Sequence, residues 1–232
     1  MNKSSFTIKK ILILVLILAV PGFLYYLLTA KGKNRYKPLA IYGPKEVAKT
    51  GHKFHGKYIP DTIYHKLPNF EFTNQEGKAV KLNDFDYKVF VVNLFYTQCP
   101  DVCSKVNKNI DRLAGAFRKN RMVKFVSITV NPEFDNTARL QSYAKPWGYA
   151  ADKWMFLRGD TATTYNFARN GLLVNAVKMN NNFVFDSKLV LIDAEKRIRG
   201  YYDGTNLQEI VKLNDEIKVQ IAEELRKIKA PN

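Results

Sequence analysis

Residues 89–103 read VFVVNLFYTQCPDVC, a near-continuous apolar run followed by a segment that contains two cysteines. Such a run is typical of a central β-strand that is covered on both faces. After the second cysteine, apolar residues recur at spacings of three and four and predict an amphipathic helix. They are Val106, Ile110, Leu113, Ala114 and Phe117. The sequence therefore predicts a buried strand, a short loop and a helix in direct succession.

The segments on either side continue this alternation. Phe70–Phe72 and Ala79–Leu82 flank a polar turn at residues 74–77, which predicts a hairpin. We expect later strands at 122–130 and 154–157, helices around 140–143 and over 161–169, a hairpin formed by 189–193 and 197–202, and an amphipathic C-terminal helix over 207–228. This order of elements predicts an α/β domain with a thioredoxin-like fold.

Ahead of this domain lies a long apolar segment. Residues 11–30 carry no charge, and about 20 helical residues at ~1.5 Å each span the ~30 Å hydrocarbon core of a bilayer. Tyr25 and Tyr26 lie near its distal end, where aromatic rings favour the membrane interface. The alternative is a cleaved signal peptide, whose apolar region is usually about 7–15 residues long. We therefore expect an uncleaved N-terminal transmembrane helix.

These patterns divide the chain into three regions. We expect a membrane anchor at residues 1–30, a linker at 31–66 and a thioredoxin-like domain at 67–232. The linker is polar, is broken by glycine and proline, and has no sustained period.

The charge of the chain is strongly basic, with a formal net charge of +16. Residues 1–40 hold seven Lys and Arg and no acidic residue, and the rest of the chain has a net charge of +9. Basic residues do not cluster with interleaved aromatic residues in the manner of a nucleic-acid site, so we expect no nucleic-acid partner. A basic surface of this kind suits anionic lipid headgroups.

Cys99 and Cys103 are the only cysteines in the chain, which excludes a disulfide-rich scaffold. We expect Cys99 in the loop after the buried strand and Cys103 in the first turn of the helix, with Pro100 at the helix start. A helix N-terminus favours the thiolate, which is the form that attacks a disulfide and binds a soft metal. Two sulfurs one turn apart can close a disulfide or bind one copper ion. The alternative is that both pack as small hydrophobic residues.

The stretch from Pro68 to Leu225 resembles the Sco/SenC family, thioredoxin-fold proteins implicated in copper delivery to cytochrome c oxidase. The segments that carry the resemblance are Phe95–Cys103, Ser127–Asp135, Trp154–Asp160 and Leu189–Gly204. The resemblance implies one N-terminal anchoring helix in the cell membrane, with the domain on the periplasmic side. It also implies a cytochrome c oxidase subunit, or another copper or thiol protein, as the partner.

The same resemblance implies copper ligands at Cys99 and Cys103 together with one distal histidine. The position that aligns with this histidine is Phe185, and no histidine follows His65. Ser104 and Asn131 also depart from the residues usual in the family. Cu(I) tolerates two thiolate ligands, whereas Cu(II) prefers sites with nitrogen donors. His52 and His55 form a His-x-x-His pair in the linker, which we interpret as surface residues rather than metal ligands.

Three hypotheses follow for the function. The first is a Sco-like protein that handles copper through Cys99 and Cys103 during assembly of the oxidase. The second is a membrane-anchored thiol–disulfide oxidoreductase without stable copper binding, in which the more exposed cysteine attacks and the other resolves the mixed disulfide. The third is a scaffold or assembly factor in which the chemistry of the cysteines is vestigial.

Overall fold

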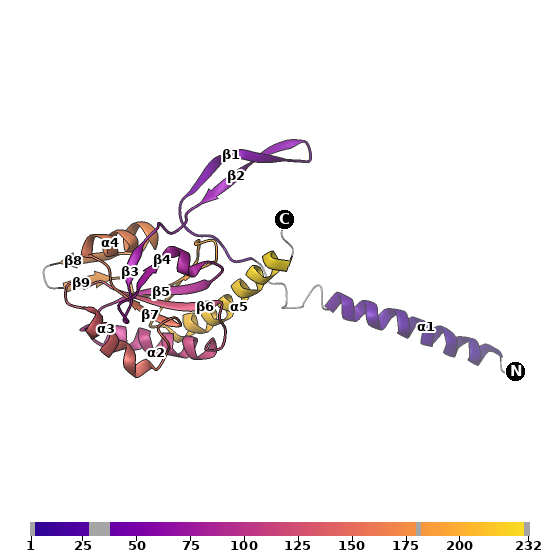
Figure 1. The fold of residues 1–232 in the computed structure, drawn as a ribbon. Coiled ribbons are helices and arrows are strands. Elements are labelled where there is room, and N and C mark those ends of the chain that lie inside the picture. Colours follow the sequence, from indigo (N-terminus) through magenta and orange to yellow (C-terminus); the bar gives the residue numbers. More distant parts are fainter. Residues whose placement is uncertain (1–2, 28–37, 180–181, 230–232) are drawn as a thin grey trace. The chain divides into compact units, whose positions relative to one another are not determined.

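The structure, a computed structural model, describes residues 3–27, 38–179 and 182–229 (Figure 1). It divides into two compact units, residues 1–37 and 38–232. The expected anchor residues 28–30 and linker residues 31–37 lie outside the described residues. The second unit begins at Pro38, well before the domain start that we expect at residue 67.

The first unit contains one helix, α1 (Lys3–Tyr26), with Pro21 inside it. Its segment Lys9–Tyr26 is long and apolar enough to cross a membrane, and no other helix among the described residues is. All side chains of this segment are exposed. A signal sequence would satisfy the same criteria of length and composition.

The second unit is built on a sheet of five strands in the order β11-β10-β5-β6-β7. The strands are β5 (Val89–Phe95), β6 (Val123–Thr129), β7 (Trp154–Leu157), β10 (Lys188–Ile192) and β11 (Ile198–Asp203). The first three run parallel, and β10 pairs antiparallel with both β5 and β11. The α/β class and the central, buried position of residues 89–95 are therefore confirmed.

Both faces of this sheet are covered, which explains why β5 is apolar at every position except the buried Asn93. Val91 and Phe95 pack into one core cluster with α2 (Asp101–Ala116) and α5 (Leu207–Lys229). Phe90, Val92 and Leu94 point to the opposite face and pack into a second cluster, to which α4 (Thr161–Asn166) and the π-turn Phe167–Gly171 contribute. Side chains of neighbouring strand residues alternate between faces, so a two-sided core requires apolar residues at nearly every position.

The shorter elements agree with the sequence in part. The hairpin of β3 (Glu71–Thr73) and β4 (Ala79–Lys81) is confirmed, and so is α3 (Thr137–Ala144), which is followed by the 3₁₀ turn Lys145–Trp147. A second 3₁₀ turn, Leu82–Phe85, follows β4. Two further hairpins were not predicted: β8 (Ala176–Met179) with β9 (Asn182–Phe185), and β1 (Lys45–Phe54) with β2 (Lys57–Tyr64). The last of these lies in the stretch that we expect to be a linker, and its sequence lacks the apolar alternation that would reveal a strand.

Candidate functional site

The two cysteines form a disulfide at the start of α2, with their Cα atoms 5.8 Å apart. Cys99 lies in the loop between β5 and α2, and Cys103 lies in the first helical turn, as predicted. Pro100 is the N-cap residue of this helix. Cys103 is buried, with 3% of its surface exposed, whereas Cys99 is half-buried. Cys99 is therefore the sulfur that a reductant or a partner thiol reaches first.

A buried carboxylate holds the loop that carries Cys99. Asp135 is fully buried and accepts hydrogen bonds from the Thr97 backbone N–H, at 3.0 Å, and from the hydroxyl groups of Thr97 and Thr129. The Cys99 N–H donates to the Tyr96 carbonyl at 3.1 Å, which closes a tight turn. The sequence reasoning did not single out Asp135 as a site residue, although it ends the Ser127–Asp135 segment that carries the family resemblance.

Because all three of its partners donate to Asp135, an asparagine in its place would turn an N–H donor toward one of them. We expect Asp135→Asn to lower the free energy of unfolding by about 1–3 kcal/mol, measured by urea denaturation of the oxidised protein. The matched control is Asp152→Asn, because the Asp152 side chain is 79% exposed and pairs only with Lys124 at 2.9 Å. Equal effects of the two substitutions would contradict the role of Asp135.

A groove of about 630 Å³ lies beside the loop and is lined in part by Thr97, Gln98, Arg139 and Tyr143. The Tyr143 ring stacks on Phe95 with 5.2 Å between centroids, and its hydroxyl accepts a hydrogen bond from the Asn107 amide at 2.7 Å. Burial raises the pKa of Tyr143 to about 12. The Tyr143 side chain in the wall of this groove is therefore neutral at neutral pH.

Phe185, the residue aligned with the expected histidine, lies close to the cysteine loop. Its ring meets the Tyr96 ring edge to face, with centroids 6.1 Å apart, and it packs against the same core cluster as Cys99 and Cys103. The backbone just after it lies beside α2: the Gly204 N–H donates to the Ser187 carbonyl at 2.9 Å, and a Cβ on Gly204 would meet both that carbonyl and Val106. An aromatic side chain, which offers no nitrogen donor, thus lies in the part of the domain that contains the cysteine loop.

None of the three histidines of the chain is grouped with the cysteines. His52 lies on β1 and pairs with Asp61 at 3.2 Å, and both side chains are exposed. His55 sits in the turn of the same hairpin and meets the Phe54 ring edge to face. The Nε2 atom of His65 lies 2.8 Å from the Gly171 carbonyl oxygen, so that nitrogen is occupied as a hydrogen-bond donor.

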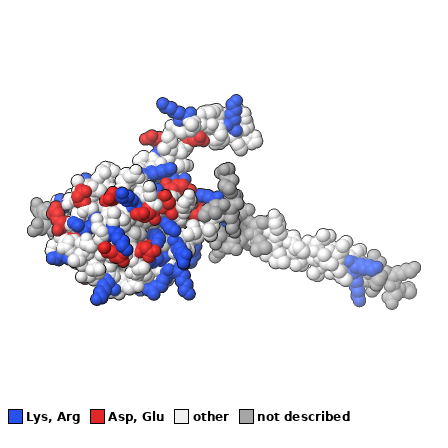
Figure 2. Space-filling model, viewed as in Figure 1, with Lys and Arg blue, Asp and Glu red and all other residues white. Residues whose placement is uncertain are grey.

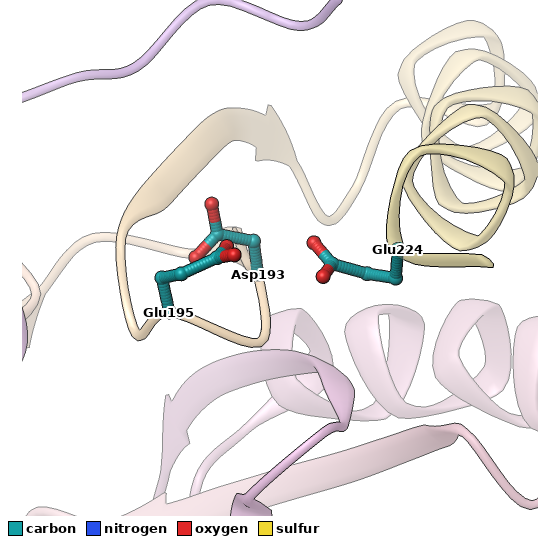
Figure 3. A group of neighbouring side chains, drawn as sticks. All are labelled: Asp193, Glu195 and Glu224. Atoms are coloured by element: carbon teal, nitrogen blue, oxygen red, sulfur yellow. The ribbon is translucent and has the colours of Figure 1, made fainter. Parts of the chain in front are cut away.

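Asp193, Glu195 and Glu224 are the one group among the described residues that brings three ligand-type atoms within 4.8 Å of one another (Figure 3). Cations already neutralise these carboxylates. Asp193 pairs with Arg197 at 2.8 Å and with Arg199 at 3.1 Å. Lys227 pairs with Glu195 at 2.7 Å and with Glu224 at 3.0 Å. Asp193 and Glu195 follow the end of β10 whose last residue, Ile192, pairs with Phe90 near the start of β5, and Glu224 reaches them from α5 (Figure 3). It is therefore a structural ion-pair network at the opposite end of the sheet from the cysteines.

A model of the SCO1/SenC family matches residues 62–220. The chain belongs to the SCO1/SenC family. A SCO1 protein homolog of Bacillus subtilis is 24% identical over 153 residues, which cover 64% of this chain and 79% of that protein. The matched region begins within β2 and includes the whole five-stranded sheet and both cysteines.

Solved structures of this family have the same fold. A SCO1/SenC family lipoprotein from Bacillus anthracis superposes with a TM-score of 0.63 and 24% identity, covering 67% of this chain and 95% of that chain. Arabidopsis thaliana ScoI, solved with copper bound, superposes with a TM-score of 0.57 and 21% identity, covering 69% of this chain and 98% of that chain. These similarities confirm the thioredoxin-like fold predicted from the sequence.

Proposed function

We propose that this chain is a membrane-anchored protein that binds Cu(I) between Cys99 and Cys103 and delivers the copper to the assembling copper centre of cytochrome c oxidase. In this proposal residues 1–30 contain the anchor, residues 31–37 connect it to the unit that begins at Pro38, and this unit lies on the periplasmic side. The observation that carries the proposal is the cysteine pair at the start of α2 in a chain of the SCO1/SenC family.

Copper enters this scheme as cargo, and it requires the reduced pair. Reduction of the Cys99–Cys103 disulfide takes two electrons and two protons from an external dithiol, which itself becomes a disulfide. Binding of Cu(I) then displaces the two thiol protons. The donor set fits Cu(I), which accepts two thiolates, and does not suit Cu(II), because the residue aligned with the expected histidine is Phe185, which offers no nitrogen ligand.

An anaerobic Cu(I) titration of the reduced full-length protein against a chromophoric chelator tests this proposal. We expect one Cu(I) to bind per chain, and none to bind to the Cys99→Ser/Cys103→Ser variant. The matched control is His52→Ala/His55→Ala, which removes two potential ligands from the β1–β2 hairpin and is expected to leave the stoichiometry and affinity unchanged. Equal copper binding by the wild type and the double serine variant would refute the proposal.

A second function is favoured by Phe185, because the missing imidazole leaves a dithiol that is free to do redox chemistry. In this alternative the Cys99 thiolate attacks a disulfide of a partner protein and one partner sulfur leaves as a thiolate. Cys103 then attacks the Cys99 sulfur, closes the disulfide and releases the reduced partner. The greater exposure of Cys99 suits it to the attack.

The two functions separate in one pair of assays. A reductase reduces a model disulfide peptide, and its Cys103→Ser variant accumulates a mixed disulfide through Cys99. If the reduced protein does this while binding Cu(I) no better than the double serine variant, the oxidoreductase function is the correct one.

A further inference from the structure

The β1–β2 hairpin extends from the rest of its unit as a separate two-stranded sheet (Figure 1). Its strands pair with each other from Lys45↔Tyr64 to Phe54↔Lys57, and neither pairs with another described strand. The turn at His55 and Gly56 has positive φ angles of 47° and 77°, which is the backbone of a tight type I′ hairpin. An isolated two-stranded hairpin is at best marginally stable in water, so a surface that covers it would stabilise it.

The hairpin exposes a set of large apolar side chains that the protein itself does not cover. Their exposed fractions are 76% for Val47, 58% for Phe54, 58% for Tyr58, 40% for Ile59 and 53% for Ile63. Phe54, Tyr58 and Ile59 are all within three residues of the turn, so the tip is the most aromatic part of the hairpin. The pairs Phe54↔Lys57 and Lys53↔Tyr58 place Phe54 and Tyr58 on opposite faces of the hairpin, so both faces of its tip carry an exposed aromatic ring. Exposed apolar groups gathered at one tip mark a surface that contacts a partner or a membrane.

Lysines alternate with these apolar residues along the hairpin. Lys45, Lys49, Lys53 and Lys57 are all exposed, against two acidic residues, Glu46 and Asp61. Figure 2 shows basic side chains extending from the hairpin. The chain just before it adds Lys31, Lys33, Arg35 and Lys37 with no acidic residue. Such a combination of lysines with interfacial aromatic residues complements a surface of anionic phosphates over an apolar layer.

The covalent distance to the anchor is short. Leu39, whose carbonyl accepts a hydrogen bond from Arg199 at 2.7 Å, is the thirteenth residue after Tyr26, the last residue of α1. At ~3.5 Å per residue this connection is at most about 45 Å long. The hairpin begins six residues later, at Lys45. A domain held on so short a connection keeps the hairpin within reach of the lipid headgroups next to the anchor.

We propose that the β1–β2 hairpin binds the anionic headgroups of the membrane in which the protein is anchored. The lysines pair with lipid phosphates, Phe54 and Tyr58 enter the interfacial layer, and the domain is thereby held in a defined orientation to the bilayer. This inference rests on the proposed membrane anchoring and is independent of the copper or redox chemistry at the cysteines.

The test uses the full chain reconstituted into liposomes of phosphatidylcholine, with or without phosphatidylglycerol. Hydrogen–deuterium exchange of the amides over residues 45–64 is the measurement. We expect severalfold slower exchange in the liposomes that contain phosphatidylglycerol. Lys49→Gln/Lys53→Gln/Lys57→Gln removes the difference, while Lys105→Gln/Lys108→Gln/Lys119→Gln retains it. The control removes the same charge from exposed positions on and after α2.

Each other outcome overturns the inference. Equal exchange in both kinds of liposome, fast or slow, excludes anionic lipid as the ligand; equal slow exchange would point to apolar contact or self-association instead. If both lysine variants lose the difference in exchange between the two kinds of liposome, the effect comes from the total positive charge of the domain rather than from the hairpin. Release of the chain from phosphatidylcholine liposomes by alkaline carbonate would refute the anchoring itself, and so distinguishes failure of the anchor from failure of the hairpin contact.

Discussion

Replacing Phe185 with histidine is expected to tighten Cu(I) binding by at least about tenfold, which corresponds to about 1.4 kcal/mol. The Phe185 ring lies beside Tyr96, whose carbonyl bonds to the Cys99 N–H, and it packs against the cluster that contains both cysteines. An imidazole at this position would add a nitrogen donor to two sulfurs and complete a three-ligand site. The same variant is expected to retain Cu(II), which the wild-type donor set does not suit.

Competition with a chromophoric chelator measures the Cu(I) affinity, and a thiolate-to-Cu(II) absorption band in the visible range reports Cu(II). The matched control is Phe183→His, on the same strand. The Phe183 ring also lies near Tyr96, with 5.0 Å between centroids, but Phe183 packs against the opposite core cluster. If the two histidine variants tighten Cu(I) binding equally, or if neither does, residue 185 is not the position of the third ligand.

The elements that sequence reasoning predicts correctly are those whose burial leaves a local pattern. β5 is apolar except at Asn93 because both of its faces are covered, and α2 has one apolar stripe because only one of its faces packs on the sheet. These spacings of apolar residues can be recognised within one short segment of sequence, without knowledge of any tertiary contact. The position of Cys103 in the first turn of α2 follows from the same two patterns.

The hairpins that sequence reasoning missed carry no such pattern. Nearly all strand residues of the β1–β2 hairpin are exposed, so neither face has a core that would select apolar residues at alternate positions. β8 and β9 are four residues each; β8 has one buried residue, and β9 alternates only between exposed and half-buried residues. Exposed strands of this kind are defined by their partner strand rather than by their own sequence.

The candidate site also combines features that the sequence reveals with features that depend on tertiary contacts. The cysteine pair and the missing histidine are readable from the sequence, since they rest on residue identity and spacing. Asp135 is not, because its hydrogen bond to Thr97 joins residues 38 positions apart. The difference in exposure between Cys99 and Cys103 likewise depends on what α2 and the neighbouring loops cover.

Arg199→Met is expected to lower the free energy of unfolding by about 3–5 kcal/mol, the usual cost of removing one partner from a buried ion pair. The Arg199 side chain is 3% exposed and bonds to Asp193 at 3.1 Å and to Glu223 at 2.8 Å. Its guanidinium also donates to the carbonyl oxygens of Leu39, at 2.7 Å, and Ala40, at 3.2 Å. Methionine is of similar length but leaves two carboxylates and two carbonyls with one donor fewer each.

Urea denaturation of the oxidised protein measures the loss, and Lys218→Met is the control. Lys218 pairs with Asp215 at 2.9 Å, but both side chains are more than half exposed, so its loss is expected to cost less than about 1 kcal/mol. A second measurement separates a local effect from a global one: the Leu39 N–H, which donates to Glu223 at 2.8 Å, is expected to exchange faster in Arg199→Met under native conditions. Unchanged exchange at Leu39 would mean that the segment entering the domain is held by other contacts, such as the bridge between Tyr42 and Ile198. Faster exchange would identify Arg199 as the residue that fastens this segment to α5 and β11.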